Sequence, residues 1–399
     1  MSKAKRRVPK LRFPGFTEDW EPCEFKNLFK KNLEKNNGKF KSDKTISIAK
    51  MTFNELGNGA SEESLDNYKV LRIGDIAFEG HENKDFKFGR FVMNDIGNGI
   101  MSPRFTTLRP IELLELDFWK EYINYESIMQ KKLVHSTKKG TMMHELVVDE
   151  FLKQEILVPP EKEQQHIGCL LKFLSKVISL QQRKLEHLNL KKKALLQKLF
   201  PKEGARYPEL RFPGFTDAWE QRKLGDYLSI PEKEILEVAS SDDLITVKLN
   251  LGGVELGASR DTLSLGSTVY YKRYAGQFIY GKQNFFNGSM GLIPTNLDGK
   301  GSSGDVPSFN VSNIEENYLY TYVSRESYWR SKEAAASGTG SKRIHEKTFL
   351  DFNIDVPSMD EQKLISNTFD LIDRFITLHQ RKLEHLRIQK KSLLQQLFV

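Results

Sequence analysis

Two stretches of the sequence gather side chains that could hold a polyanion. Lysines and arginines stand there among glycine, serine, asparagine and aromatic residues. Such cations contact phosphates, and arginine, lysine, asparagine and glutamine can also hydrogen-bond to base edges. We predict contacts of this kind for Lys84, Lys87, Arg90, Arg104, Lys138, Lys139, Tyr271, Lys272, Arg273, Lys282, Asn284, Lys300, Lys342 and Arg343. Any one of them alone is more typical of a solvated surface charge, so the prediction depends on the whole set.

The sequence offers no arrangement that indicates catalysis. A GxxxxGK[ST] phosphate loop, an HExxH pair and a GxSxG elbow are missing, and we expect no dinucleotide-binding fold. Asp75 and Ser102, in two turns, have no partner group in view. Four histidines lack the spacing of metal ligands, namely His81, His135, His144 and His345. We therefore predict no catalytic residue, no metal site and no cofactor bound by this chain.

The composition suits a multidomain protein with a polyanionic partner. The chain has 399 residues, which favours two or more domains. Its net charge of +8 favours nucleic acid or an anionic membrane surface as the partner. No apolar run approaches the roughly 20 residues of a membrane span, and the basic N-terminus lacks the apolar core of a secretory signal. Two cysteines without CxxC spacing, Cys23 and Cys169, indicate a reducing compartment, so we expect a cytoplasmic protein.

The candidate contact residues lie within a sequence unit that occurs twice in the chain. PKLRFPGFTEDWE at 9–21 returns as PELRFPGFTDAWE at 208–220. QQRKLEHLNLKKKALLQKLF at 181–200 returns at 379–398 with 14 of 20 positions identical. Between these pairs, the segment that begins ILVPPEKEQQ at Ile156 matches IDVPSMDEQK at Ile354. Because self-similarity at a fixed offset marks a repeat architecture, we expect two copies of one frame.

The regions inside the two frames differ from each other. Residues 22–155 and 222–354 show no convincing mutual similarity, and each mixes strand and helix patterns. We therefore interpret them as two small α+β domains. The two frames would then share one function, while the two inserts have different functions.

A heptad pattern predicts a long helix at the end of each frame. Eight of ten seam positions are apolar in each copy, and the polar interruptions match, Gln181 with His379 and Lys192 with Lys390. A single amphipathic helix packs more often on its own domain, but two matched helices favour antiparallel pairing with each other. The predicted spacer and docking residues are Leu171, Leu174, Ile178, Leu185, Leu188, Leu195, Phe369, Ile372, Ile376, Leu383, Leu386 and Leu393.

The repeated RFPGF phrase is interpreted as a corner piece against a helix end. The second phrase follows the first long helix, so the first phrase should lie near Phe398 and Val399, at the end of the second helix. The alternative is a pair of solvated Pro-Gly turns, against which the density of large aromatic residues argues. The residues predicted to pack are Phe13, Phe16, Trp20, Phe212, Phe215 and Trp219.

Taken together, these motifs resemble the specificity (S) subunits of Type I restriction–modification systems. The resemblance covers essentially the whole chain. It depends on the doubled RFPGF…W phrase, the VPP…EQQ and VPS…DEQ segments, and the doubled QRKLEHL…KK…LLQ…LF helices. It implies an α+β protein in which two globular mixed domains are joined by two long antiparallel coiled-coil helices, as a pseudo-twofold internal repeat.

The resemblance also implies the boundaries of the parts. The N-terminal tail and first corner motif would occupy 1–21, and a first target recognition domain 22–157. A central spacer helix at 158–200 and a linker with the second corner motif at 201–221 would follow. The second target recognition domain would occupy 222–356, and the C-terminal spacer helix 357–399.

The partners implied by the resemblance are double-stranded DNA, two modification (M) subunits and, in the full complex, restriction (R) subunits. Each recognition domain would read one half of a split, asymmetric target, while the helices fix the gap and dock the M subunits. S-adenosylmethionine, ATP and magnesium would belong to the partner subunits, and this chain would be non-catalytic and without a membrane partner.

Three other interpretations remain open from the residues. A stand-alone two-headed DNA-binding regulator would bind DNA tightly without an M subunit. A structural adaptor whose inserts bind proteins would show little salt-dependent affinity for DNA, because that dependence comes from phosphate contacts. An enzyme with an unrecognised site ranks last.

Overall fold

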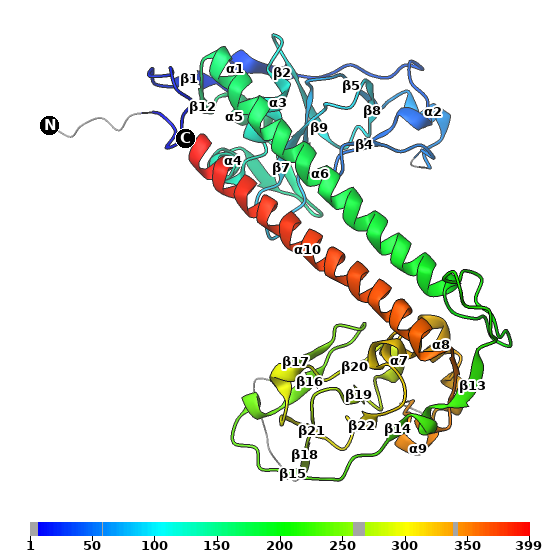
Figure 1. Ribbon diagram of the computed structural model, residues 1–399. Coiled ribbons are helices and arrows are strands. Elements are labelled where there is room, and N and C mark those ends of the chain that lie inside the picture. The colour runs from blue at the N-terminus through cyan, green and yellow to red at the C-terminus, as the bar shows by residue number, and fades with distance from the viewer. Residues whose placement is uncertain (1–6, 58, 258–267, 338–341) are drawn as a thin grey trace. The chain divides into compact units, whose positions relative to one another are not determined.

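The computed structural model describes residues 7–57, 59–257, 268–337 and 342–399, and Figure 1 traces the chain. Contacts divide the chain into two compact units. Unit 1 contains Met1–Arg183 and Arg381–Val399, and unit 2 contains Lys184–Gln380. The boundaries fall inside the two long helices, so each unit combines a globular domain with parts of both helices.

The two long helices begin just after the repeated Val-Pro segments. Helix α6 spans Glu161–Lys198, and helix α10 spans Met359–Leu397. The preceding valines still belong to strands β12 (Glu155–Val158) and β23 (Asn353–Val356), so the helices begin a few residues later than the expected spacer segments. Acidic residues in both first turns favour a helix start there, because the N-terminal end of a helix carries a partial positive charge.

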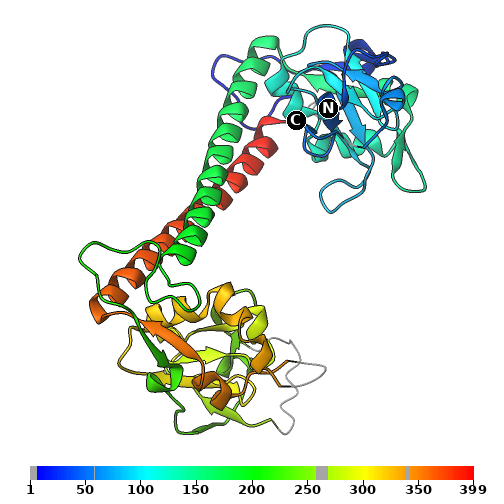
Figure 2. The same ribbon diagram turned by 90° about the vertical axis from the view of Figure 1, so that its right-hand side faces the viewer.

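The heptad seam is the covered face of both helices. All the seam positions named above are buried or half-buried in both helices. Within unit 1, Lys390 donates to the Ser175 hydroxyl at 2.9 Å, and Arg387 donates to Gln182 at 3.4 Å. Residue numbers rise along one helix as they fall along the other, so the two helices pair antiparallel in this unit, where they lie side by side in both views (Figure 2).

Unit 2 repeats this pairing with the other halves of the same helices. Lys192 forms an ion pair with Asp373 at 2.6 Å, and the ring of Phe200 lies 6.0 Å from that of Phe369. The order of these contacts again makes the helices antiparallel.

Each domain core includes the start of one long helix and the end of the other. In unit 1 the core takes Ile167 and Leu171 from α6, and Leu397 at the end of α10, followed by Phe398. The core of unit 2 likewise takes Ile365 and Phe369 from α10, together with Leu199 and Phe200 after α6. Both interpretations of the amphipathic face therefore apply, because each helix packs on its own domain and on its partner helix.

A four-stranded antiparallel sheet lies at the centre of the domain in unit 1. Its order is β2 (Phe29–Lys31), β9 (Thr106–Pro110), β6 (Ile76–Glu79) and β7 (Arg90–Met93). The other strands are β1 (Glu21–Glu24), β3 (Ile46–Ser47), β4 (Thr52–Phe53), β5 (Lys69–Leu71), β8 (Gly99–Met101), β10 (Thr137–Lys139) and β11 (His144–Leu146). The short helices are α1 (Phe25–Leu28), α2 (Glu62–Leu65), α3 (Leu116–Tyr122), α4 (Glu126–Leu133), α5 (Val148–Leu152) and η1 (Ser42–Lys44).

The domain in unit 2 has a sheet of the same order. It consists of β14 (Leu228–Ser229), β22 (Ser308–Val311), β19 (Phe278–Tyr280) and β20 (Met290–Leu292). The remaining strands are β13 (Glu220–Lys223), β15 (Ile235–Leu236), β16 (Ile245–Val247), β17 (Val254–Leu256), β18 (Tyr270–Lys272) and β21 (Gly301–Ser303). The helices are α7 (Glu316–Val323), α8 (Glu326–Arg330), α9 (Glu346–Leu350), η2 (Leu224–Asp226), η3 (Ser241–Asp243), η4 (Phe285–Asn287), η5 (Thr295–Leu297) and η6 (Glu333–Ala335).

The two inserts thus share one fold although their sequences do not match visibly. The turn before the third strand of the sheet illustrates this. The Asp75 carboxylate accepts a hydrogen bond from the backbone of Arg72 at 2.8 Å, and the Gln277 amide oxygen accepts one from the backbone of Tyr274 at 3.1 Å. Asp75 and Gln277 are both buried, so the same turn is held by two different polar side chains.

Among the described residues, no helix combines the length and apolarity that a membrane span requires.

Candidate nucleic-acid interface

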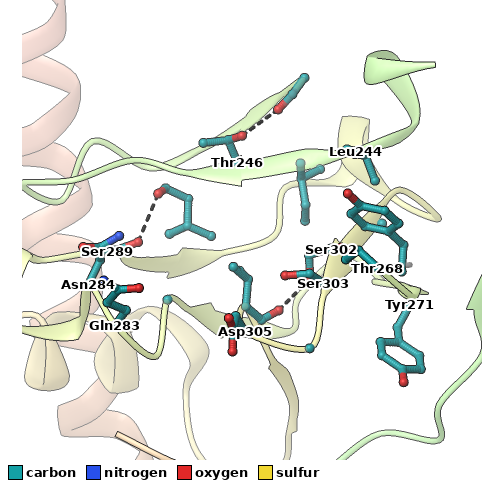
Figure 3. Close-up of a pocket in the computed structure, with 18 of the residues that line it drawn as sticks. Leu244, Thr246, Thr268, Tyr271, Gln283, Asn284, Ser289, Ser302, Ser303 and Asp305 are labelled. Carbon is teal, nitrogen blue, oxygen red and sulfur yellow. Dashed lines mark hydrogen bonds between the residues drawn. The ribbon is translucent and has the colours of Figure 1, made fainter. Parts of the chain in front are cut away.

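An open cleft of about 1160 Å³ lies in unit 2 between two layers of strands. The β16–β17 hairpin forms one wall, and strands β18 and β21 with the turn after β19 form the other (Figure 3). Its lining carries many uncharged polar side chains: Thr246, Thr268, Tyr270, Tyr271, Gln283, Asn284, Ser289, Ser302 and Ser303.

Three hydroxyls of this lining donate into the walls of the cleft. Thr246 donates to the carbonyl of Gly257 at 2.6 Å, Ser289 to that of Val247 at 3.0 Å, and Ser302 to that of Val306 at 2.6 Å. Figure 3 draws these bonds as dashed lines. These bonds use the one proton of each hydroxyl, and because Ser289 and Ser302 are buried, the half-buried Thr246 is the one of the three whose oxygen can accept a hydrogen bond from a ligand.

Two neutralised charges complete the lining. Lys248 pairs with Glu255 at 3.0 Å, and Asp305 pairs with Arg343 at 3.1 Å. The cleft therefore offers hydrogen bonds without a strong local charge, which suits base edges better than phosphates.

The predicted cations of unit 2 surround this cleft and already have carboxylate partners. Lys282 pairs with Glu346 at 3.0 Å, Lys300 with Asp243 at 3.8 Å and Lys342 with Glu333 at 3.2 Å. Lys272 pairs with Glu234, and this ion pair raises the pKa of Lys272. Each lysine would have to exchange a carboxylate for a phosphate on binding DNA.

Arg273 differs from the other predicted contacts. Its side chain is buried, and its guanidinium donates to the Ser302 hydroxyl at 2.7 Å and to the Val306 carbonyl at 3.3 Å. Burial lowers its pKa to about 10. The prediction of a direct contact is corrected here, because the guanidinium lies beneath the 301–306 loop and supports the cleft wall.

The letters GxGxxG do occur at Gly299–Gly304, within this wall. They do not mark a dinucleotide site, because strand β21 (Gly301–Ser303) occupies the middle of the segment. The dinucleotide fingerprint instead opens a helix, whose N-terminus binds the pyrophosphate.

The predicted cations of unit 1 lie on a surface with a smaller pocket. Arg104 lines this pocket of about 480 Å³ together with Thr106 and His144. Arg90 is held in the sheet by Glu79 at 2.7 Å. The remaining predicted lysines are exposed and, among the described residues, form no ion pair: Lys84, Lys87, Lys138 and Lys139. Unit 1 thus presents free cations, whereas unit 2 presents paired ones.

A buried ion pair fixes the corner phrase of each frame to a long helix. Arg12 binds the Glu163 carboxylate through two hydrogen bonds of 2.8 Å, and Trp20 donates to the same carboxylate at 3.2 Å. In unit 2, Arg211 binds Glu361 at 2.9 and 2.8 Å. The bond to the carboxylate raises the pKa of each arginine. Sequence reasoning missed these pairs, although both partners lie inside the repeated phrases.

The corner phrases close each unit against the end of a helix. The backbone of Leu11 donates to Gln396 near the end of α10 at 3.0 Å, and Leu210 donates to Lys198 at the end of α6 at 2.8 Å. Gly15 and Gly214 have φ of 96° and 93°, which glycine adopts without strain, so the Pro-Gly pair can turn.

The predicted aromatic residues of the corner phrases differ in burial. Trp20 and Trp219 are almost fully buried, and Phe13, Phe16, Phe212 and Phe215 are half-buried. Both phenylalanines of the first phrase contact the ring of His166 on α6, at 5.5 and 5.6 Å between centroids.

Within the described residues, no group of three or more His, Cys, Asp or Glu side chains has the arrangement of a metal site. The chain thus presents two domains of one topology, each carried on shared helices and each with a polar hollow that has cationic side chains around it. This class of protein is a two-headed binding protein built on a repeated frame.

The chain belongs to the Type I restriction modification DNA specificity domain family, whose model matches residues 17–190 and 217–387. It is 24% identical to a putative type I restriction enzyme MjaX specificity subunit of Methanocaldococcus jannaschii, over 94% of this chain and 92% of that one. The MjaVIII specificity subunit of the same organism is 22% identical over 68% of each chain. A solved S subunit of a Type I system from M. genitalium shares the fold, with a TM-score of 0.56 at 14% identity, over 98% of this chain and 99% of that chain.

Proposed function

We propose that this chain is the DNA-recognition subunit of a Type I restriction–modification complex and that its two domains read the two halves of a split target. The main observation behind this proposal is that the two domains have the same sheet order but different surfaces. Unit 2 offers a neutral polar cleft with paired cations, whereas unit 1 offers a small pocket and free cations. Two different surfaces of this kind suit an asymmetric, bipartite sequence.

The two long helices suit a spacer that fixes the length of the unread DNA between the two half-sites. Each helix runs from one unit into the other, and each domain core takes residues from both helices. Exposed apolar side chains remain outside the seam, including Phe173, Leu180, Leu371 and Leu378. We propose that modification subunits dock on the helices and that these residues contribute.

The chemistry of the complex would belong to the partner subunits. The M subunits would bind S-adenosylmethionine and methylate adenine, and R subunits would supply ATP- and magnesium-dependent cleavage in the cytoplasm. This chain would bind no cofactor and carry no catalytic residue. Its direct DNA contacts would come from the predicted cations, with Arg273 as a support.

Mapping of N6-methyladenine across a host genome tests this function. The gene is supplied together with its neighbouring M gene, and the control carries the M gene alone. A split motif that is methylated on both strands only when this gene is present is the expected result. No gained motif, with both proteins expressed and assembled, would instead favour the regulator or adaptor interpretation.

A further inference from the structure

The lysine that interrupts the heptad seam meets a carboxylate from a different element in each unit. In unit 1, Lys390 of α10 forms an ion pair with Glu121 of α3 at 2.7 Å and donates to the Ser175 hydroxyl of α6 at 2.9 Å. In unit 2, Lys192 of α6 forms its ion pair with Asp373 of α10 at 2.6 Å. The carboxylate therefore belongs to the inserted domain in unit 1 and to the partner helix in unit 2.

Ring contacts show which residues of α3 and α7 are equivalent. Each of these helices packs on the phenylalanine that follows a long helix, Phe398 in unit 1 and Phe200 in unit 2, and the two phenylalanines correspond in the repeated sequence. The ring centroid of Tyr122 lies 4.8 Å from that of the first phenylalanine. The ring centroid of Tyr322 lies 5.6 Å from that of the second. The two tyrosines therefore occupy one position.

A second pair of ring contacts gives the same register. Phe118, four residues earlier in α3, lies 5.9 Å from the terminal phenylalanine ring of unit 1. Tyr318, four residues earlier in α7, lies 5.9 Å from the terminal phenylalanine ring of unit 2. Glu121 and Thr321 directly precede the two matched tyrosines, so threonine stands in the second insert where the first has glutamate.

The long helices are matched by their heptad seam. Leu174 and Ile372 hold the same seam position, and Ser175 and Asp373 directly follow them. Each seam lysine therefore has the same two positions beside it, one on the insert and one on the partner helix. Unit 1 has glutamate on the insert and serine on the helix, whereas unit 2 has threonine on the insert and aspartate on the helix. One of the two positions is acidic in each unit.

A lysine in a covered seam needs such a carboxylate, because an unpaired charge that is removed from water is destabilising. The exposed fractions of the side chains are 21% for Lys390 and 17% for Glu121, against 32% for Lys192 and 51% for Asp373. The pair in unit 1 is more shielded from water and should therefore contribute more to stability. Serine and threonine at the remaining positions avoid a second negative charge, which an incidental surface pair would not require.

We propose that this contact matches each insert to its own frame and thereby fixes the order of the two domains along the chain. The first insert in the second frame would place Glu121 and Asp373 beside one lysine, where the two carboxylates repel each other. The second insert in the first frame would leave Lys390 with Thr321 and Ser175, without a carboxylate. The match does not depend on the proposed DNA-recognition function, under which it would also fix the order of the half-sites.

Single substitutions reproduce each mismatch in the full-length chain. Glu121→Thr gives the first insert the residue of the second, and it should lower the midpoint of thermal unfolding by about 3 °C. Thr321→Glu gives the second insert the residue of the first. It should lower the midpoint by about 1 °C, because this site is more exposed to solvent.

Compensating changes in the long helices should undo both losses. In Glu121→Thr with Ser175→Asp, the acid has moved from the insert to the helix, which is the arrangement of unit 2. This double variant should recover most of the wild-type midpoint, whereas Ser175→Asp alone should lower the midpoint because two carboxylates then face each other. Thr321→Glu with Asp373→Ser should likewise recover the midpoint, and Asp373→Ser alone should lower it.

Matched controls separate the ion pair from general effects of the substitutions. Glu384→Thr and Ser179→Asp make the same changes at exposed positions of the long helices within unit 1. Each should shift the midpoint by less than about 1 °C. Ser179→Asp should also fail to rescue Glu121→Thr, since it lies outside the seam.

Two outcomes would overturn the inference. One is a loss in Glu121→Thr that is no larger than the loss in Glu384→Thr. The other is a double variant of Glu121→Thr with Ser175→Asp whose midpoint falls by the sum of the two single losses. If compensation holds but the wild-type complex shows no split target, the recognition function fails and the match between insert and frame stands.

Discussion

At the scale of single residues, the buried ion pairs of the frame are the most exacting contacts. Glu163 has a fully buried carboxylate that is satisfied by Arg12 and Trp20. A buried charge is tolerated only when it is paired and hydrogen-bonded, because removal from water is costly. The pair recurs as Arg211–Glu361, which indicates that both frames need the same ion pair between corner phrase and helix.

Removing one partner of the Arg12–Glu163 ion pair should destabilise unit 1 strongly. Arg12→Met leaves the Glu163 carboxylate buried without its main partner, so we expect a loss of about 3 kcal/mol in the free energy of unfolding. Arg12→Met combined with Glu163→Met should recover most of that loss, because the buried charge is then absent. Urea titration of the single and double variants measures both values, and an additive double variant would contradict the ion-pair interpretation.

A second residue-scale prediction concerns acid. Arg72, followed by Arg109 and Lys39, lowers the pKa of Glu34 to about 2, below its ordinary value of 4.5. The stabilisation is therefore complete above about pH 4.5 and is lost as the pH falls toward about 2. Glu34→Gln should reduce stability by about 1 kcal/mol at pH 7, since the pairs are partly solvated.

The measurement is the urea midpoint of wild type and Glu34→Gln from pH 7 to the lowest pH at which both fold. The difference between them should be constant near neutrality and should shrink below pH 4.5. A difference that grows on acidification would contradict the assigned direction of the pKa shift.

At the scale of elements, the long helices were the part most predictable from sequence. Their heptad pattern is regular over many turns, and such a pattern leaves few alternatives to a helix with one covered face. The shared topology of the inserts was not predictable in the same way. Its strands are two to five residues long, and the turn that they share is held by two different buried polar side chains, whose equivalence one sequence cannot separate from chance.

The candidate site was less predictable than the elements around it. An arginine such as Arg273 has the same letter whether it lies on the surface or beneath a loop. The ion partners of Lys272, Lys282 and Lys300 are distant in sequence, so their neutralisation appears only in the fold.

The seam of the helices can be tested by placing charge in it. Leu383 is almost fully buried and Leu185 is half-buried on this face. Changing both to Asp should cost about 2 kcal/mol or more and prevent assembly with M subunits, because one carboxylate would be buried and the other half-buried without partners. Thermal unfolding of the isolated chain and co-purification with the M subunit are the measurements.

The matched control is Leu180→Asp with Leu378→Asp on the exposed faces of the same helices. The exposed fraction of Leu180 is 55%, and that of Leu378 is 58%. This variant should keep the thermal unfolding of the wild type. Intact stability and assembly of the seam variant would refute the claim that the helix pair holds the molecule together.

At the scale of the whole molecule, the repeated frame should make the domains exchangeable. Residues 22–155 can be replaced by the corresponding region of another member of the family, since the ends of this region pair with each other through strands β1 and β12. We expect the methylated motif to change in one half-site only. A change in both halves would refute two independent readers.

The sharing of helix ends between the units has a consequence for synthesis of the protein. The core of unit 1 contains Leu397 and Phe398, which are translated only after the whole of unit 2. At ordinary elongation rates, the first domain must wait roughly 10 to 40 s after its own residues are made before its hydrophobic centre can close. Premature termination before Leu397 would therefore destabilise the domain that was translated first.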